Sequence, residues 1–134
     1  MLKIGFDVHG VLDTLPEFLT LAYVMMESPE FEVHVITGLK LIDIQKEIGH
    51  LIDLSKVKYF SVVDHLTEKG VEIDWVDGLP WADTKEWDNA KAEYCEREQI
   101  DIVFDDSPYY GVTFESINTT YCHVQTTKRK KFDM

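Results

Sequence analysis

Acidic, histidine and hydroxyl side chains occur in three short segments, each of which directly follows a run of apolar residues. The segments are Asp7-Val8-His9-Gly10, Thr37-Gly38 and Asp105-Asp106-Ser107. Carboxylates that lie close together repel one another, and this repulsion raises a pKa. A divalent cation removes the repulsion, and oxygen ligands at a hard site favour Mg²⁺. If the three segments meet in space, the sequence therefore predicts metal-assisted chemistry on a phosphate group.

The apolar runs before these segments are expected to be strands that alternate with helices. Strands are predicted at residues 2–6, 32–36, 57–63, 100–104 and 121–125, and helices at 14–27, 41–51 and 85–98. Such alternation is typical of an α/β fold with a doubly wound, mostly parallel sheet and helices on both sides. Ligands of these sheets bind beyond the carboxyl ends of the strands, which is where the three segments lie.

Two stretches carry local signals of their own. Thr14 and Glu17 have the spacing of a capping box, and Pro16 lies in the first turn of the helix that Thr14 is expected to begin. Residues 64–84 contain two glycines, a proline and two tryptophans with mixed polarity. We expect a small hairpin or an irregular flap there.

The three segments resemble motifs of the haloacid dehalogenase-like (HAD) superfamily. Ile4–Asp13 resembles the first motif, an apolar strand followed by Asp-x-Asp-Gly, and Val35–Gly38 resembles the second, an apolar strand closed by Thr or Ser. Ile102–Ser107 resembles the fourth motif, an apolar strand closed by an acidic pair. Lys91 occupies the place of the lysine of the third motif. The resemblance covers most of the chain and implies a Rossmann-like, HAD-like core with a minimal cap or none.

The resemblance implies that Asp7 attacks phosphorus and forms an aspartyl-phosphate. This role suits a carboxylate, which is nucleophilic at neutral pH without a base. Mg²⁺ is the implied cofactor, and its implied ligands are Asp7, Asp105, Asp106 and the backbone carbonyl of His9. Simpler interpretations remain open, in which Asp7 caps a loop and the acidic pair is solvated at a strand end.

A phosphate-binding role is implied for three further residues. The Thr37 hydroxyl and the nearby Gly38 amide would hold a phosphoryl oxygen, and Lys91 would neutralise the charge that develops as the group moves. Alternatively, Thr37 is a helix N-cap and Lys91 is an exposed helix lysine. Lys85 and Lys40 are rival candidates for the catalytic lysine.

His9 stands where the family has its second aspartate, which protonates the leaving group and then activates water. Such acid–base help is worth roughly 10²–10⁴ in rate. Imidazole has an ordinary pKa near ~6.5, so it can do both steps near neutral pH. In the other interpretation the acid–base step is lost, and the site binds a phosphorylated ligand and turns it over slowly.

One domain is expected over residues 1–127, with 64–84 as a possible flap in place of a cap domain and a basic tail over 128–134. A site without a cap domain is open to solvent unless the flap or a second copy of the chain covers it. A homo-oligomer in which one subunit covers the site of another is therefore one expected arrangement. A nucleobase or a sugar ring could stack on five aromatic side chains, although packing within the protein also explains them: Trp75, Trp81, Trp87, Tyr109 and Tyr110.

Composition excludes several classes of protein. The 134 residues are 45% hydrophobic and 28% charged, which is typical of soluble globular proteins. No apolar run approaches the ~18 residues of a membrane span, and the first residues lack the apolar stretch of a signal peptide. Cys95 and Cys122 form no C-x-x-C pattern, which fits a reducing cytoplasm.

The formal net charge of −12 is unevenly distributed. Residues 1–127 have a net charge of −15, and residues 128–134 have +3. An acidic body repels duplex nucleic acid and anionic membranes, because phosphate binding needs clustered lysines and arginines. Neither is therefore an expected partner.

The residues and their resemblance to the HAD motifs together imply a Mg²⁺-dependent hydrolase. It would be a phosphatase of a small phosphorylated metabolite or nucleotide that acts through an aspartyl-phosphate on Asp7. The alternative is a catalytically weakened HAD-like protein that binds and sequesters a phosphorylated or nucleotide-like ligand, for example a nucleotide signal. A third hypothesis is an interaction module whose acidic body binds a basic partner. The expected location is the cytoplasm.

Overall fold

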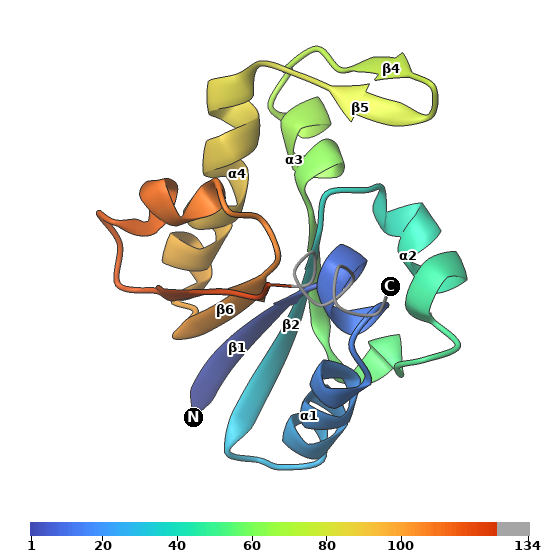
Figure 1. Ribbon diagram of the computed structural model, residues 1–134, viewed down its shortest axis with the longest axis vertical. Helices are drawn as coiled ribbons and strands as arrows, with labels where there is room; N and C mark the ends of the chain where they lie inside the picture. Colours follow the sequence, from blue (N-terminus) through green and yellow to red (C-terminus); the bar gives the residue numbers. More distant parts are fainter. Residues whose placement is uncertain (126–134) are drawn as a thin grey trace.

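Five parallel strands form the central sheet of the protein, whose computed structural model describes residues 1–125 (Figure 1). In their order across the sheet, the strands are β3 (Lys58–Ser61), β2 (Phe31–Thr37), β1 (Leu2–Asp7), β6 (Ile102–Asp105) and β7 (Thr120–His123). Every pair of neighbours in this sheet is parallel. The predicted α/β fold with a doubly wound parallel sheet is confirmed.

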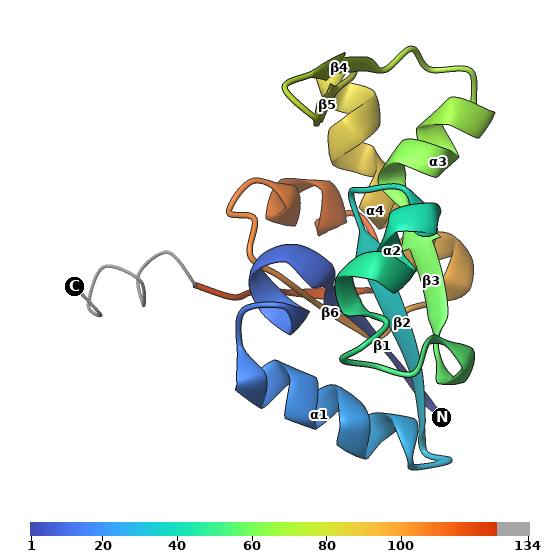
Figure 2. The same cartoon turned by 90° about the vertical axis from the view of Figure 1, so that its right-hand side faces the viewer.

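Helices cover both faces of the sheet, as Figures 1 and 2 show. The helices α1 (Pro16–Met26) and α2 (Leu41–Ile48) pack on one face, and α3 (Val62–Glu68) and α4 (Thr84–Glu98) pack on the other. None of the helices in the described part of the chain has the length and apolar character that a membrane crossing requires.

Alternation along the strands divides the apolar residues between two cores. Ile4 and Phe6 of β1 lie in the core beneath α1 and α2, whereas Ile36 of β2 and Val103 of β6 lie in the core beneath α3 and α4. Burial of one such side chain stabilises the fold by about 1.5–3 kcal/mol. The sheet is therefore anchored from both sides, which fixes the positions of the residues at its carboxyl edge.

The predicted cap of the first helix is wrong. α1 begins at Pro16, and Leu15 holds the capping position without a side-chain hydrogen bond. The Thr14 hydroxyl instead donates to Asp13 Oδ1 at 2.7 Å. The turn over Val8–Leu12, in which His9 and Gly10 have non-helical backbone angles, precedes the helix.

The predicted third strand is too long. β3 ends at Ser61, and Val62 and Val63 begin α3. The Ser61 hydroxyl accepts a hydrogen bond from the Asp64 amide at 3.0 Å, so Ser61 caps the helix. The apolar run 57–63 thus belongs to two elements.

The segment 64–84 contains the expected hairpin. Its strands are β4 (Asp74–Val76) and β5 (Leu79–Trp81), which pair antiparallel. Asp77 and Gly78 join them with φ values of 53° and 76°, which suit a two-residue hairpin turn. In Figure 1 the hairpin lies beyond the carboxyl edge of the sheet, after α3 and before α4. The predicted basic tail 128–134 lies outside the described residues.

Candidate functional site

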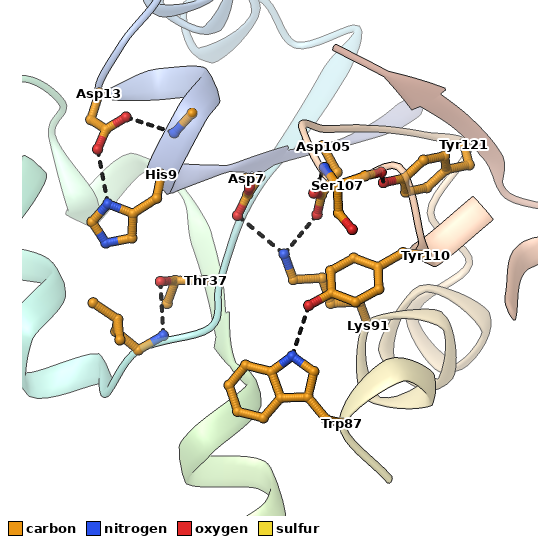
Figure 3. Close-up of polar contacts among 12 residues, drawn as sticks. Asp7, His9, Asp13, Thr37, Trp87, Lys91, Asp105, Ser107, Tyr110 and Tyr121 are labelled. Atoms are coloured by element: carbon orange, nitrogen blue, oxygen red, sulfur yellow. Dashed lines mark hydrogen bonds and ion pairs between the residues drawn. The ribbon is translucent and has the colours of Figure 1, made fainter. Parts of the chain in front are cut away.

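Asp7, Thr37 and Asp105 are the last residues of β1, β2 and β6. Because β1 lies between β2 and β6 and all three run in parallel, these residues meet at one edge of the sheet. All three side chains are buried, and buried polar groups require partners. Figure 3 shows that Asp7 and Asp105 both face Lys91. The three segments that the sequence analysis assigned to this edge therefore come together.

The Lys91 ammonium lies between the two acids. Its Nζ donates to Asp7 Oδ1 at 3.1 Å and to Asp105 Oδ2 at 2.6 Å, and its side chain is only 6% exposed. Burial alone would lower the pKa of Lys91, but the facing carboxylates outweigh it and the pKa is raised. Of the rivals, Lys85 is exposed and Lys40 lies against the hairpin. Lys91 is thus the lysine that contacts the strand-end acids.

The Asp7 carboxyl group has an unusual environment. Burial raises the pKa of Asp7 to about 8; Lys91 opposes the rise, and the neighbouring Asp105 and Asp106 carboxylates add to it. A raised pKa favours the protonated form of Asp7, and a protonated carboxyl group is a poor nucleophile. A divalent cation bound by these carboxylates would favour the ionised form. The electrostatics fit a site that a cation completes.

Three carboxylates could supply metal ligands. One oxygen from each of Asp7, Asp105 and Asp106 lies within 4.8 Å of the other two. Both Asp105 oxygens already accept hydrogen bonds, Oδ2 from Lys91 and Oδ1 from the Ser107 amide at 2.9 Å. Mg²⁺ in proteins typically takes one or two carboxylates and keeps several waters. Asp7 and Asp106 are therefore the better-placed pair, and Asp105 mainly positions Lys91.

Gly10 allows the Asp106 carboxylate to approach. A Cβ atom at Gly10 would lie 2.0 Å from Asp106 Oδ2, and the φ of Gly10 is +88°. Both facts require glycine at this position. The close approach seats Asp106 against the turn that follows Asp7. The sequence analysis gave Gly10 no role beyond its place in the motif, because this contact joins segments far apart in the chain.

Both ring nitrogens of His9 face carboxylates. Nδ1 lies 2.9 Å from Asp13 Oδ2, and Nε2 lies 2.7 Å from Glu47 Oε2 of α2. Imidazole can donate from both nitrogens at once only in its cationic form. His9 is 49% exposed and lines the cavity described below. Its ring could transfer a proton to a ligand only after Nε2 leaves Glu47. The His9 carbonyl remains a predicted metal ligand.

Asp13 and Glu47 were not among the predicted site residues. Asp13 Oδ1 accepts hydrogen bonds from the Gly10 amide at 2.8 Å and from the Thr14 hydroxyl. Burial alone would raise the pKa of Asp13, but the bonds from Thr14, Gly10 and His9 lower it. The spacing of Asp13, four residues after His9, could have indicated this contact. Glu47 could not have been found this way, because it reaches His9 from another element.

The turn after β2 brings Gly38 to the site. Thr37 is not a helix N-cap: α2 begins at Leu41, and Thr37 Oγ1 instead accepts a hydrogen bond from the Leu39 amide at 3.1 Å. Gly38 packs on Trp87, since a Cβ atom at Gly38 would lie 3.3 Å from the indole. Gly38 and Leu39 line the cavity. The backbone of this turn is thus placed to contact a ligand, with Thr37 buried beneath it.

A cavity of about 500 Å³ lies over the strand-end acids. This volume is within the usual range for small-molecule sites. One end is polar, and the β5 end of the hairpin contributes an apolar wall. The lining includes Asp7, His9, Lys91, Asp105 and Asp106 at the polar end, Leu79, Pro80 and Trp81 of the hairpin, and Ala82, which follows the hairpin.

Aromatic side chains fix the lining near Lys91. Trp87 Nε1 donates to the Tyr110 hydroxyl at 2.7 Å, and Lys91 Nζ lies 5.2 Å from the centre of the Tyr110 ring. A lysine over an aromatic face is attracted by the ring quadrupole. Figure 3 shows the bond from Trp87 to Tyr110 and, separately, the bonds from Lys91 to Asp7 and Asp105. Contacts within the protein therefore hold Trp87, Tyr110 and Lys91 together at this end of the cavity.

Comparisons with protein-family models, with curated proteins and with solved structures found no match for this chain. What the site can do is therefore inferred from its own groups. These are a buried carboxylate beside a buried ammonium, a second carboxylate within metal-bridging distance, and a cavity above them.

Proposed function

We propose that this protein is a Mg²⁺-dependent hydrolase of small phosphomonoesters, with Asp7 as the nucleophile. One observation carries the proposal: the buried Asp7 carboxylate lies 3.1 Å from Lys91 Nζ and close to Asp106, at the polar end of a cavity of about 500 Å³. The resemblance of the strand-end segments to HAD motifs supports the same chemistry. The cavity size favours a small substrate over a macromolecule.

In the proposed reaction the Asp7 carboxylate attacks phosphorus, the ester bond breaks, and the departing alcohol oxygen takes up a proton. Water then attacks the aspartyl-phosphate, which releases inorganic phosphate and restores Asp7. The Lys91 ammonium and the Gly38 amide stabilise the negative charge on the phosphoryl oxygens. Bound Mg²⁺ would add positive charge and keep the nucleophile ionised. His9 would donate the proton once its Nε2 has left Glu47.

A second candidate function is the binding and sequestration of a phosphorylated ligand without rapid turnover. The arrangement of His9 favours it, because the only group at the position of the family's acid–base aspartate is already bound by Asp13 and Glu47. Such a protein would keep the phosphate-binding groups and the cation site. It would lack a free proton donor for the leaving group.

The first test measures phosphate release from a panel of phosphomonoesters in the presence of Mg²⁺. Asp7→Asn removes the proposed nucleophile and is expected to lower kcat by several orders of magnitude. Asp53→Asn is the matched control, because Asp53 is an exposed aspartate that bonds Ser55 and does not line the cavity. Equal rates for wild type and Asp7→Asn would refute the hydrolase proposal.

Substitution of His9 separates the two candidate functions. If imidazole carries the proton, His9→Ala lowers kcat by roughly 10²–10⁴. If the natural protein mainly binds its ligand, His9→Asp raises turnover and His9→Ala changes little. Calorimetric titration with the same phosphomonoesters shows whether binding persists in each variant.

A further inference from the structure

Four residues of α4 line one side of the cavity: Thr84, Trp87, Asp88 and Lys91. Their spacing places them on a single face of the helix, and a rise of about 1.5 Å per residue separates Thr84 from Lys91 by roughly 10 Å along the axis. A phosphoryl group bound near Asp7 and Lys91 would occupy only the Lys91 end of the cavity. The part of the cavity toward Thr84 is left for the remainder of a substrate.

Aromatic and apolar groups surround this outer part. Pro80 and Trp81 come from the hairpin, and Trp87 comes from α4, where its bond to Tyr110 fixes it. Trp81 is 62% exposed, and no aromatic ring of residues 1–125 stacks on either indole. An exposed indole that lines a cavity and lacks a ring partner is a surface that a flat ligand can cover.

We propose that the preferred substrates carry a planar aromatic ring that packs against Trp81 and Trp87, as the base of a nucleoside 5′-monophosphate would. This inference rests on the function proposed above. Stacking on an aromatic side chain accepts many kinds of ring, because every base has a π-face. Thr84 supplies a hydrogen-bond partner at the outer end, and Asp88 supplies another between Thr84 and Lys91. The Asp88 carboxylate favours a ring that bears donors and disfavours a second anionic group there.

The test compares adenosine 5′-monophosphate with ribose 5-phosphate, which is the same phosphomonoester without the base. With Mg²⁺ present, kcat/KM is measured if phosphate is released, and the Kd is measured by calorimetry whether or not it is. We expect the wild-type protein to prefer the nucleotide by about tenfold or more. Trp81→Ala should remove this preference, because it should weaken use and binding of the nucleotide much more than those of ribose 5-phosphate.

Trp75→Ala is the matched control, because Trp75 lies on the same hairpin but packs against Lys40 and does not line the cavity. It should keep the preference for the nucleotide. Equal use and equal binding of the two compounds by the wild type would overturn the inference, as would equal effects of the two tryptophan variants. Turnover without preference would leave the hydrolase proposal standing. Preferential binding without turnover would overturn the hydrolase proposal alone.

Discussion

Lys91 is the residue on which the buried charge at the sheet edge depends. One ammonium faces two carboxylates, those of Asp7 and Asp105, and all three groups are almost fully buried. Removing one member of a buried ion pair is costly because the remaining charge stays desolvated, whereas an exposed pair contributes about 0–1 kcal/mol. Lys91 therefore has a structural role in addition to its proposed role toward phosphate.

Lys91→Met should lower the free energy of unfolding by about 3–5 kcal/mol, because it leaves two buried carboxylates facing each other. Urea unfolding at neutral pH measures this loss. Lys69→Met is the control, since Lys69 Nζ lies 2.8 Å from Glu86 in a well-exposed pair, and its loss should lower the free energy of unfolding much less. Similar losses in the two variants would contradict the assignment of a buried network.

Gly10→Ala should impair the site beyond its effect on the backbone. The new Cβ atom would collide with the Asp106 carboxylate and displace it, so we expect weaker Mg²⁺ dependence and lower turnover. Gly70→Ala is the control: the φ of Gly70 is +86°, but no atom lies within 4 Å of a Cβ there. Both variants should lose roughly 1–2 kcal/mol of stability from the positive φ. If the two proteins retain the same activity, the contact between Gly10 and Asp106 is not important for the site.

At the scale of elements, the sequence predicts strands better than their ends. Apolar runs followed directly by polar residues placed Asp7, Thr37 and Asp105 correctly at the carboxyl edge, because a parallel sheet aligns its strand ends. The apolar runs could not show at which residue β3 ends and α3 begins. That boundary depends on the Ser61 hydroxyl capping a helix, and the run 57–63 is apolar on both sides of it.

Contacts between elements were beyond the reach of sequence patterns. The Glu47–His9 contact joins α2 to the turn after β1, and the Gly10–Asp106 contact joins that turn to the end of β6. No spacing along the chain encodes either distance. The sequence therefore predicted which residues lie at the carboxyl edge of the sheet, but it could not predict which of them contact one another.

The hairpin is the element that the substrate proposal depends on most. Replacing residues 74–81 by a short Gly-Ser linker should change the free energy of unfolding by less than about 1 kcal/mol, because an isolated two-stranded hairpin is marginally stable and its large apolar side chains are mostly exposed. The value of kcat/KM should fall, because one wall of the cavity is removed. Urea unfolding and phosphate release measure the two effects. A large loss of stability would instead indicate that the hairpin belongs to the core.

At the scale of the whole molecule, a buried histidine links the sheet to α4. His34 of β2 is fully buried; its Nδ1 lies 2.6 Å from the Tyr94 hydroxyl, and its Nε2 lies 2.7 Å from Glu32 Oε2. Burial lowers the pKa of His34, although Glu32 opposes the change. The hydrogen bond from His34 lowers the pKa of Glu32 to about 2. Both shifts make stability depend on pH.

His34 and Glu32 should each contribute a loss of stability as the solution becomes acidic. Below the ordinary histidine pKa of about 6.5, His34 binds a proton in the unfolded chain more readily than in the folded protein. The free energy of unfolding therefore decreases as the pH is lowered. Between pH 4.5 and about 2, the unfolded chain also protonates Glu32 before the folded protein does, which adds to the loss. Urea midpoints measured from pH 7.5 to pH 4 should fall less steeply for His34→Gln than for wild type. Parallel curves would contradict this role of His34.

The positive charge of the Lys91 side chain also affects whether the protein can fold before a metal ion binds. Because the polypeptide carries its own positive charge for Asp7 and Asp105, the sheet edge can close before any ion is acquired. Small zinc domains differ, since their ligands stay unfolded until the metal arrives. If the proposed Mg²⁺ binds at this edge, a chelator should leave the protein folded, because Lys91 still supplies a positive charge to Asp7 and Asp105.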